Sequence, residues 1–208
     1  VINGAKTYIT NGQNADIILT VCKTEPELGA KGTSLILIEA DRPGFARGRN
    51  LDKVGQWMAD TSELFFNDVR VPASNVIGEV NRGFIYLVSD LPQERLSISI
   101  TAQAAAQRAF DEAVAFTKDR TAFGTVIFNH QAVQFRLADM ATQIEAARQL
   151  IWHAASMKDA GKPCLKEAAM AKLFASEIAE RVCSDAIQIH GGYGYLSDFP
   201  VERIYRDV

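Results

Sequence analysis

Residues 165–195, LKEAAMAKLFASEIAERVCSDAIQIHGGYGY, place a long alanine-rich stretch directly before a run of glycines. The bulky apolar side chains of this stretch recur at helical spacing, which predicts a helix from residue 165 to about residue 188. The run from Gly191 to Tyr195 either ends the helix as a glycine-assisted turn or brings backbone N–H groups close to a phosphate. Local evidence favours the turn, because the run does not follow a strand as a dinucleotide-binding fingerprint does. The apolar side of the predicted helix carries Met170, Leu173, Phe174, Ile178 and Val182.

Two more long helices are predicted before this one. Apolar residues keep helical spacing over residues 96–116 and again from about residue 130 to residue 158, where Gly161 and Pro163 follow as stop signals. A last short helix is predicted to begin near Pro200. Long helices joined by short connections pack as antiparallel neighbours, so the sequence predicts an antiparallel helical bundle.

The chain before Gly83 has a different composition. Nine of its fourteen glycines fall within residues 1–83, among short β-branched or aromatic runs that end in turn formers such as Asn11-Gly12. These runs, at residues 6–10, 16–22, 34–39 and 63–66, predict antiparallel strands. We therefore expect an α+β protein, with an antiparallel β domain over residues 1–80 followed by the antiparallel helical bundle over residues 81–208.

Composition excludes several classes of protein. The 208 residues are 48% hydrophobic, which supplies a sizeable core and excludes disorder of the whole chain. The formal net charge of -3 gives no reason to expect nucleic acid as a partner. No apolar run approaches the ~20 residues that span a bilayer, so no membrane span is expected. His153 and His190 are interpreted as structural or surface residues. No metal site or disulfide framework is suggested by the three cysteines, Cys22, Cys164 and Cys183.

Three polar positions are candidates for chemistry on the residues alone. Arg120, before Phe123-Gly124, lies between the first two helices, where an arginine either reaches a ligand or a neighbouring subunit or is simply solvated. Gln131 begins the second helix, where free N–H groups favour an anion, although an ordinary polar surface residue explains it equally well. Glu94 precedes an apolar helix, and burial there would raise its pKa as a catalytic base requires. An ordinary first-turn glutamate is the better prediction from the sequence physics of Glu94.

Taken in order, seven segments resemble the acyl-CoA dehydrogenase family of flavoproteins. The resemblance covers essentially all 208 residues, and so many matches in one order are far more specific than any of them alone. The matching segments are NGAKTYITNG (3–12), ELFFNDVRVP (63–72), RTAFG (120–124), LADM (137–140), EAAMAK (167–172), QIHGGYGY (188–195) and VERIYRD (201–207).

The resemblance implies a longer protein and a flavin site. Members of the family have an N-terminal helical domain, a middle β domain and a C-terminal four-helix domain. By that comparison the chain, which starts at Val1 without an initiator Met, is interpreted as a fragment that lacks the first domain and the extreme C-terminus. FAD is implied between the middle and C-terminal domains, with its isoalloxazine at Tyr8, Ile9 and Thr10 and with Tyr8 in place of the frequent Trp. The residues implied to meet the pyrophosphate and adenosine of a neighbouring subunit's FAD are Arg120, Phe123, Gln131, Gln188, Gly191 and Gly192.

The chemistry implied by the resemblance is α,β-dehydrogenation of an acyl-CoA thioester. A glutamate removes the α-proton, the β-hydrogen passes as hydride to the flavin, and electrons leave to electron-transfer flavoprotein. Residues 91–96, LPQERL, resemble the long-chain and isovaleryl types, whose base matches Glu94; in most members the base lies beyond the position of Asp207. Arg95 and Thr24 match positions that meet the CoA part of the substrate, and a simple helix-surface ion pair is the alternative for Arg95. Members assemble as homodimers or homotetramers.

Other interpretations stay open beside this one. The same scaffold supports flavin monooxygenases and nitroalkane-type oxidases, which react with oxygen instead of passing electrons to a flavoprotein. A non-catalytic helical assembly fragment is another alternative, and the fragment by itself is expected to be inactive. Bacterial cytoplasm and mitochondrial matrix both suit the family.

Overall fold

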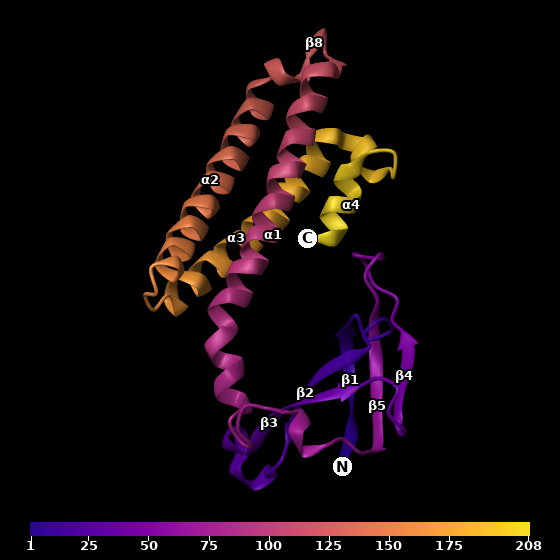
Figure 1. Cartoon of the computed structure of the whole chain (residues 1–208). Coiled ribbons are helices and arrows are strands. Elements are labelled where there is room, and N and C mark those ends of the chain that lie inside the picture. The colour runs from indigo at the N-terminus through magenta and orange to yellow at the C-terminus, as the bar shows by residue number, and fades with distance from the viewer. The chain divides into compact units, whose positions relative to one another are not determined.

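Two units make up the computed structural model, which describes residues 1–208. The first unit is Val1–Asp90 and the second is Leu91–Val208. Figure 1 labels their helices and strands. The division falls inside one long helix, α1, whose first residues belong to the β unit and whose remainder belongs to the helical unit.

The β unit holds two small antiparallel sheets, as predicted. One sheet has the strand order β1-β5-β4 and the other has the order β2-β3-β6. The strands are β1 (Ile2–Thr10), β2 (Ile17–Lys23), β3 (Thr33–Glu39), β4 (Phe45–Asn50), β5 (Thr61–Val69) and β6 (Val76–Ile77). The sequence pattern did not indicate β4, because its residues FARGRN are mostly polar, or the two-residue β6.

Alternating side chains of the strands fill the core of the β unit. Residues of β5 point alternately inward and outward, which buries Leu64 and Phe66. The ring of Phe45 from β4 packs against Phe66 at 5.4 Å between centroids. The buried cluster consists of Ile36, Ile38, Leu64, Phe66 and Val69.

A β-bulge interrupts the pairing of β1 with β5, and another interrupts the pairing of β4 with β5. Both bulges lie opposite the same residue of β5, Glu63. On β1, Thr7 and Tyr8 fall between the pairs Lys6↔Leu64 and Ile9↔Ser62, so two residues oppose Glu63 alone. On β4, Gly48 and Arg49 fall between the pairs Arg47↔Leu64 and Asn50↔Ser62, again opposite Glu63. A side chain at Gly48 would meet the Glu63 Cβ at 2.9 Å, so this bulge requires glycine.

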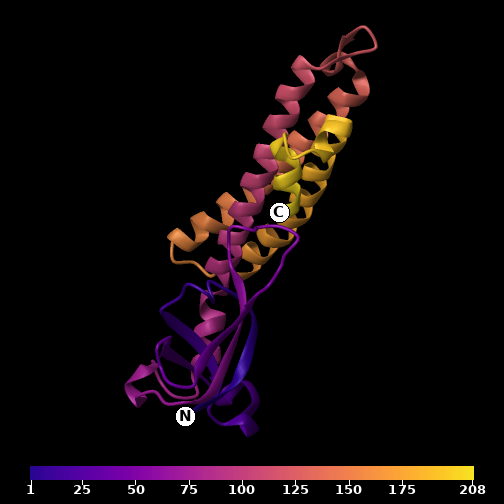
Figure 2. The same cartoon turned by 90° about the vertical axis from the view of Figure 1, so that its right-hand side faces the viewer.

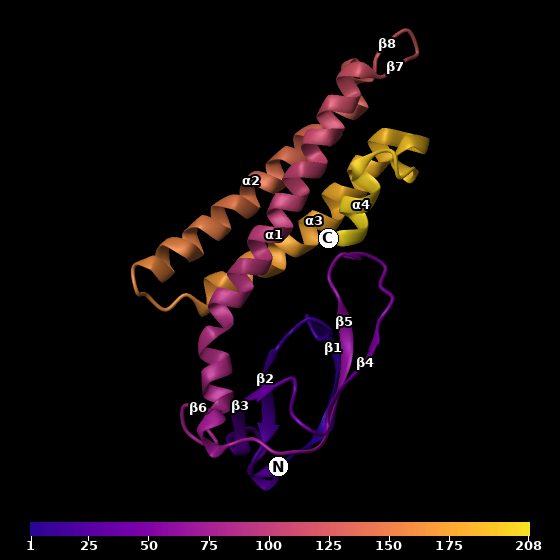
Figure 3. The ribbon, with the colours of Figure 1, turned by 45° about the vertical axis from the view of Figure 1, so that its right-hand side comes forward.

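The helical unit consists of the long helices that the sequence predicted and a short hairpin that it did not. Figure 2 and Figure 3 show α1, α2 and α3 side by side, and Figure 3 labels the hairpin of β7 and β8. Its elements are α1 (Gly83–Asp119), β7 (Thr121–Ala122), β8 (Thr125–Val126), α2 (Gln131–Asp159), α3 (Leu165–His190) and α4 (Pro200–Asp207).

Helix α1 begins earlier than the sequence pattern suggested. It starts at Gly83 instead of near Leu96 and continues through Pro92. A proline has no N–H, so the carbonyl of Val88 loses one helical bond, a loss of about 3 kcal/mol or more that neighbouring contacts must offset. Glu94 therefore lies well inside the helix and is not a first-turn residue.

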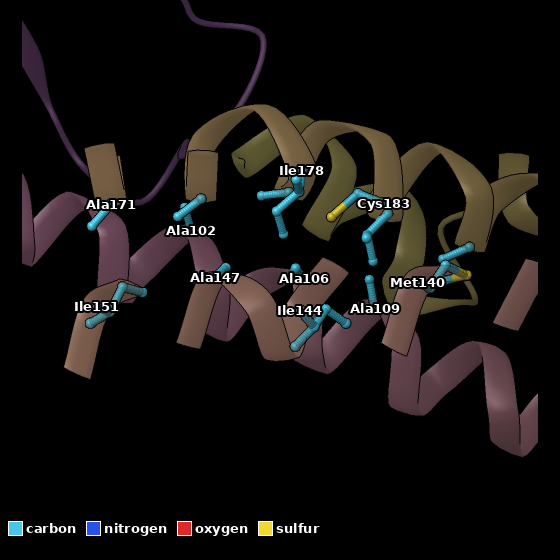
Figure 4. Packing of buried hydrophobic residues seen from close by; sticks show 14 of the residues in the cluster. Ala102, Ala106, Ala109, Met140, Ile144, Ala147, Ile151, Ala171, Ile178 and Cys183 are labelled. Atoms are coloured by element: carbon cyan, nitrogen blue, oxygen red, sulfur yellow. The ribbon is translucent and has the colours of Figure 1, made fainter. Parts of the chain in front are cut away.

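Alanines and a few larger side chains form the core of the helical unit. Figure 4 shows Ala102, Ala106 and Ala109 of α1 facing larger residues of α2 and α3. Met140, Ile144 and Ile178 are buried among them. Fully buried alanines in the cluster are Ala106, Ala109, Ala113, Ala147, Ala154, Ala168, Ala171, Ala175, Ala179 and Ala186.

The cysteines are free thiols, with Cys164 and Cys183 buried. Burial raises the pKa of the Cys183 thiol to about 12, which keeps it protonated and unreactive. No helix combines the length and the apolar character that crossing a membrane requires.

Candidate functional site

The glycine run after α3 forms a tight turn, and the structure requires glycine at some of its positions but not at others. Gly191 ends α3 at a φ of 61°, and its N–H donates to the carbonyl of Gln188. A Cβ on Gly194 would lie 2.5 Å from the carbonyl oxygen of Ile187, so the chain itself requires that glycine. Gly192 has neither a positive φ nor any atom within 4 Å of a built Cβ. The fold of this chain therefore leaves open space at Gly192, where a ligand could approach the backbone.

A surface cavity of about 390 Å³ lies beside this turn, within the helical unit. The exposed side chain of Arg120 borders it, with the guanidinium carbon 5.4 Å from the centroid of the Tyr193 ring. Arg120 makes no ion pair, so its charge is available to an anion. The cavity is lined by Phe116, Arg120, Ile127, Ile189, His190, Gly191, Gly192, Tyr193 and Leu196.

Two of the residues that line the cavity, Phe116 and His190, belong to a group of packed aromatic rings. The buried ring of His190 stacks on Phe116 at 4.2 Å between centroids, and its Nδ1 lies 2.8 Å from the carbonyl oxygen of Ala186. Phe199 meets both rings edge-on. His190 thus has a structural position, in keeping with its interpretation from the sequence.

Arg120 leads into the hairpin that carries Phe123 at its tip. Phe123 and Gly124 have φ values of 55° and 81°, as the two central residues of a type I′ turn require. The backbone N–H of Ile127 closes the hairpin by donating to the carbonyl of Arg120 at 2.8 Å. The Phe123 side chain is 96% exposed, and its nearest ring partner is His130 at 6.1 Å. A large apolar residue in this strained and exposed position fits contact with a molecule outside the chain.

The structure does not bring every predicted flavin residue into the cavity. Arg120, Gly191 and Gly192 line it together, whereas Phe123, Gln131 and Gln188 do not. Gln131 is the exposed first residue of α2, which no side chain caps, and Gln188 is exposed in the last turn of α3.

The three residues implied to meet the isoalloxazine lie at the end of β1 in the β unit. Tyr8 occupies the bulge at a φ of 62° and is 78% exposed. Thr10 is exposed as well, while Ile9 is half-buried and packs toward the core. The strand thus presents an aromatic face and a hydroxyl to the outside of its own unit.

The predicted base and CoA contacts have three different environments. The exposed Glu94 forms no ion pair or hydrogen bond through its carboxylate. Arg95 is half-buried and also makes no ion pair, which argues against the simple ion-pair alternative. The Thr24 hydroxyl lies 2.8 Å from the Ser34 hydroxyl and also bonds Asn81, so it ties the segment before α1 to the second sheet.

Sequence reasoning missed the apolar lining of the cavity. Phe116 lies one helical turn before Arg120, so the pair shares a helix face. Tyr193 lies within the glycine run and Leu196 lies shortly after it. The glycines alone do not indicate that these apolar side chains line a cavity. Across residues 1–208 no group of three or more metal-ligating side chains gathers in one place.

Comparison with known proteins places the whole chain in one family. A family model described as acyl-CoA dehydrogenase, C-terminal domain, matches residues 81–208, and one described as acyl-CoA dehydrogenase, middle domain, matches residues 1–69. An acyl-CoA dehydrogenase of Bacillus subtilis (strain 168) is 44% identical over 207 residues, which is 100% of this chain and 55% of the relative.

Two other proteins extend this similarity. The CarC subunit of the caffeyl-CoA reductase-Etf complex of Acetobacterium woodii is 42% identical over 207 residues, 100% of this chain and 55% of that protein. The crystal structure of acyl-CoA dehydrogenase from Geobacillus kaustophilus superposes with a TM-score of 0.97 at 48% identity, covering 99% of this chain and 55% of that one. The chain spans about half the length of the curated relatives it matches.

Proposed function

The chain belongs to the acyl-CoA dehydrogenase family, and from this membership we propose that the intact protein catalyses FAD-dependent α,β-dehydrogenation of an acyl-CoA thioester. Membership of the family implies a flavin cofactor, and we propose that this flavin is FAD. One observation carries it: Arg120, which has no ion pair, shares a cavity with the open backbone of Gly191 and Gly192. A cation beside a glycine backbone that a ligand can approach closely suits a diphosphate.

Residues from two copies of the protein would hold each FAD. Tyr8, Ile9 and Thr10 would meet the isoalloxazine, with the Thr10 hydroxyl as a hydrogen-bond partner for the ring. The neighbouring copy would meet the pyrophosphate and adenosine through residues of its cavity, hairpin and helix ends. That group consists of Arg120, Phe123, Gln131, Gln188, Gly191 and Gly192.

Glu94 is the proposed base. Its carboxylate has no partner within this chain, so it is available to take the α-proton of the thioester. Bound flavin supplies the acceptor for the β-hydrogen, which leaves as hydride. Arg95 and Thr24 are proposed to orient the CoA part of the substrate, Arg95 through its unpaired charge.

Self-association and an electron acceptor complete the proposal. The exposed Phe123 supports contact with a second copy in a homodimer or homotetramer. Similarity to a subunit of an Etf complex supports electron-transfer flavoprotein as the electron partner.

The decisive experiment replaces Glu94 by Gln in the intact protein. The amide keeps the size of the side chain but cannot accept the α-proton, so FAD should stay bound and oxidised when acyl-CoA is added without oxygen. Anaerobic bleaching of the flavin absorbance measures this, with the exposed Glu177→Gln as the matched control. Bleaching of the Glu94→Gln variant at the wild-type rate would assign the base to another carboxylate, and rapid reoxidation of wild type by air would favour the oxidase alternative.

A second experiment tests the cofactor site by itself. Arg120→Ala should weaken FAD binding by about 1.5–3 kcal/mol, because a charge-assisted contact to the pyrophosphate is lost. Titration of the apoprotein with FAD measures the change, with the exposed Arg181→Ala as control. Equal FAD affinities in the two variants would remove Arg120 from the site.

A further inference from the structure

The turn that follows β1 is anchored to residues far along the chain. It comprises residues 11–15, directly after the strand end that carries Tyr8 and Thr10. Arg47 of β4 donates from Nε to the carbonyl of Gly12 at 2.9 Å and from Nη2 to the carbonyl of Ala15 at 2.6 Å. These bonds span β5, since β1 and β4 lie on its opposite sides.

Asp60 anchors the same turn through its carboxylate. The backbone N–H of Gln13 donates to Oδ2 at 2.7 Å, and Asn14 Nδ2 donates to Oδ1 at 3.0 Å. Asp60 is only 9% exposed. The two donors hold the pKa of this carboxyl below its usual range, led by the bond from Gln13. The Gln13 side chain reaches the β4 bulge as well, where Nε2 donates to the carbonyl of Gly48 at 2.8 Å.

The position of Asp60 ties this anchor to the strand end. Asp60 directly precedes Thr61, which pairs with Thr10, and Ile9 pairs with Ser62. Tyr8 lies just before these pairs, at a positive φ that a large side chain adopts only when its surroundings fix it. The bulge removes ladder pairing at Thr7 and Tyr8, so the segment is held by the pairs that flank it and by the turn that follows Thr10.

We propose that Asp60 is a positioning residue for the flavin, which acts by holding the turn of residues 11–15 and thereby the orientation of Tyr8 and Thr10. It touches neither substrate nor cofactor. The inference rests on the proposed function, because it needs a flavin at Tyr8 to Thr10. Asp60 would affect the flavin only by fixing the backbone of β1, the strand that meets the flavin.

The test compares Asp60→Asn with Glu39→Gln in the intact protein. Both variants replace a hydrogen-bonded carboxylate of the β unit by an amide, but Glu39 bonds Arg42 and Asn75 and has no bond to residues 11–15. Hydrogen exchange of the Gln13 amide reports the turn without any flavin. FAD titration and the shape of the flavin absorption band report the orientation of Tyr8 and Thr10.

Asp60→Asn should speed exchange of the Gln13 amide about tenfold, raise the Kd for FAD about threefold to tenfold and change the flavin band. Glu39→Gln should change none of these. If Asp60→Asn does not fold, Asn14→Ala decides, since it removes one bond from the surface; the same changes, smaller in size, are then expected.

Two results would overturn the inference, and they differ from each other. If the wild type binds FAD and Asp60→Asn or Asn14→Ala leaves the FAD Kd and the flavin band unchanged, the inference fails and the proposed function stands. If the wild type binds no flavin, the proposed function fails and this inference fails with it.

Discussion

The helical unit and the β unit fill their cores in opposite ways. Ten fully buried alanines let the backbones of α1, α2 and α3 lie close together, with only a few larger residues between them. The core cluster of the β unit has five buried apolar residues, and its largest fully buried side chains are Ile38 and Leu64. Close backbones leave no room for added atoms, whereas a core of few large side chains cannot lose one. Enlarging a side chain should therefore damage the first core, and truncating one should damage the second.

The largest effect is expected from truncation in the β unit. Leu64→Ala removes a side chain that is 0% exposed on the central strand of its sheet, and should lower the free energy of unfolding by about 2–5 kcal/mol. Urea unfolding followed by circular dichroism measures the loss. Leu19→Ala, at a side chain 54% exposed, should change the free energy by less than about 0.5 kcal/mol. Equal losses in the two variants would mean that the β core does not depend on Leu64.

Enlargement in the helical unit comes next. Ala106→Leu adds three carbons where the alanine is 0% exposed, and the strain should lower the free energy of unfolding by about 1–3 kcal/mol. Ala104→Leu, on the exposed side of the same helix, is the matched control and should be close to neutral. The contrast between the two cores breaks down if Ala106→Leu stabilises the protein.

Two glycines of the turn after α3 should also differ in their tolerance of a larger side chain. Gly194→Ala should destabilise the fold by about 1–2 kcal/mol, because its Cβ would lie 2.5 Å from the carbonyl oxygen of Ile187. Gly192→Ala meets no atom within 4 Å, so it should change stability by less than about 0.5 kcal/mol and weaken FAD binding instead. Thermal unfolding and FAD titration of both variants separate the two causes. Unchanged FAD binding in Gly192→Ala would mean that the open space is not used.

The smallest effect concerns acid stability of the β unit. The Arg42 guanidinium, hydrogen-bonded to Glu39, lowers the pKa of that carboxyl from 4.5 to about 2. Since the folded pKa lies below the ordinary one, ionised Glu39 stabilises the fold above about pH 4.5, and this contribution is lost as the pH falls toward 2. Glu39→Gln should therefore make the loss of stability over this range shallower in urea titrations at successive pH values. The exposed Glu27→Gln should leave the slope as in wild type, and identical slopes for all three proteins would contradict the prediction.

The helices and strands that could be predicted from the sequence are those with a regular pattern of residue types. Apolar spacing predicted the three long helices, and β-branched or aromatic runs ending in turn formers predicted four of the strands. Helical apolar spacing is clear only from residue 96, so it does not indicate that α1 begins at Gly83 and continues through Pro92. The polar strand β4 carries no alternation, so its pairing with β5 is visible only in three dimensions.

Residues of the candidate site could be predicted from the sequence only where they lie in a family motif. Arg120, Gly191 and Gly192 were found from the family pattern, and the structure gathers them in one cavity. The link between Gln13 and Asp60 joins residues 47 positions apart, and no local pattern of either segment announces it. The exposed tip at Phe123 depends on a positive φ, which the dipeptide Phe-Gly does not predict.

The pairing of β1 with β5 has a consequence for the order of events during synthesis. β2 and β3 form a hairpin between neighbours in sequence, so their ladder can close soon after both have left the ribosome. β1 is made earlier, yet its partners run from Thr61 to Val69, and it must wait for β2, β3 and β4 to be translated first. The strand that carries Tyr8 thus remains an unpaired, aggregation-prone edge for as long as translation of those strands lasts. A nascent chain stalled before Thr61 should therefore present the backbone edge of β1 to chaperones, and one released past Val69, with β1 paired to β5, should not.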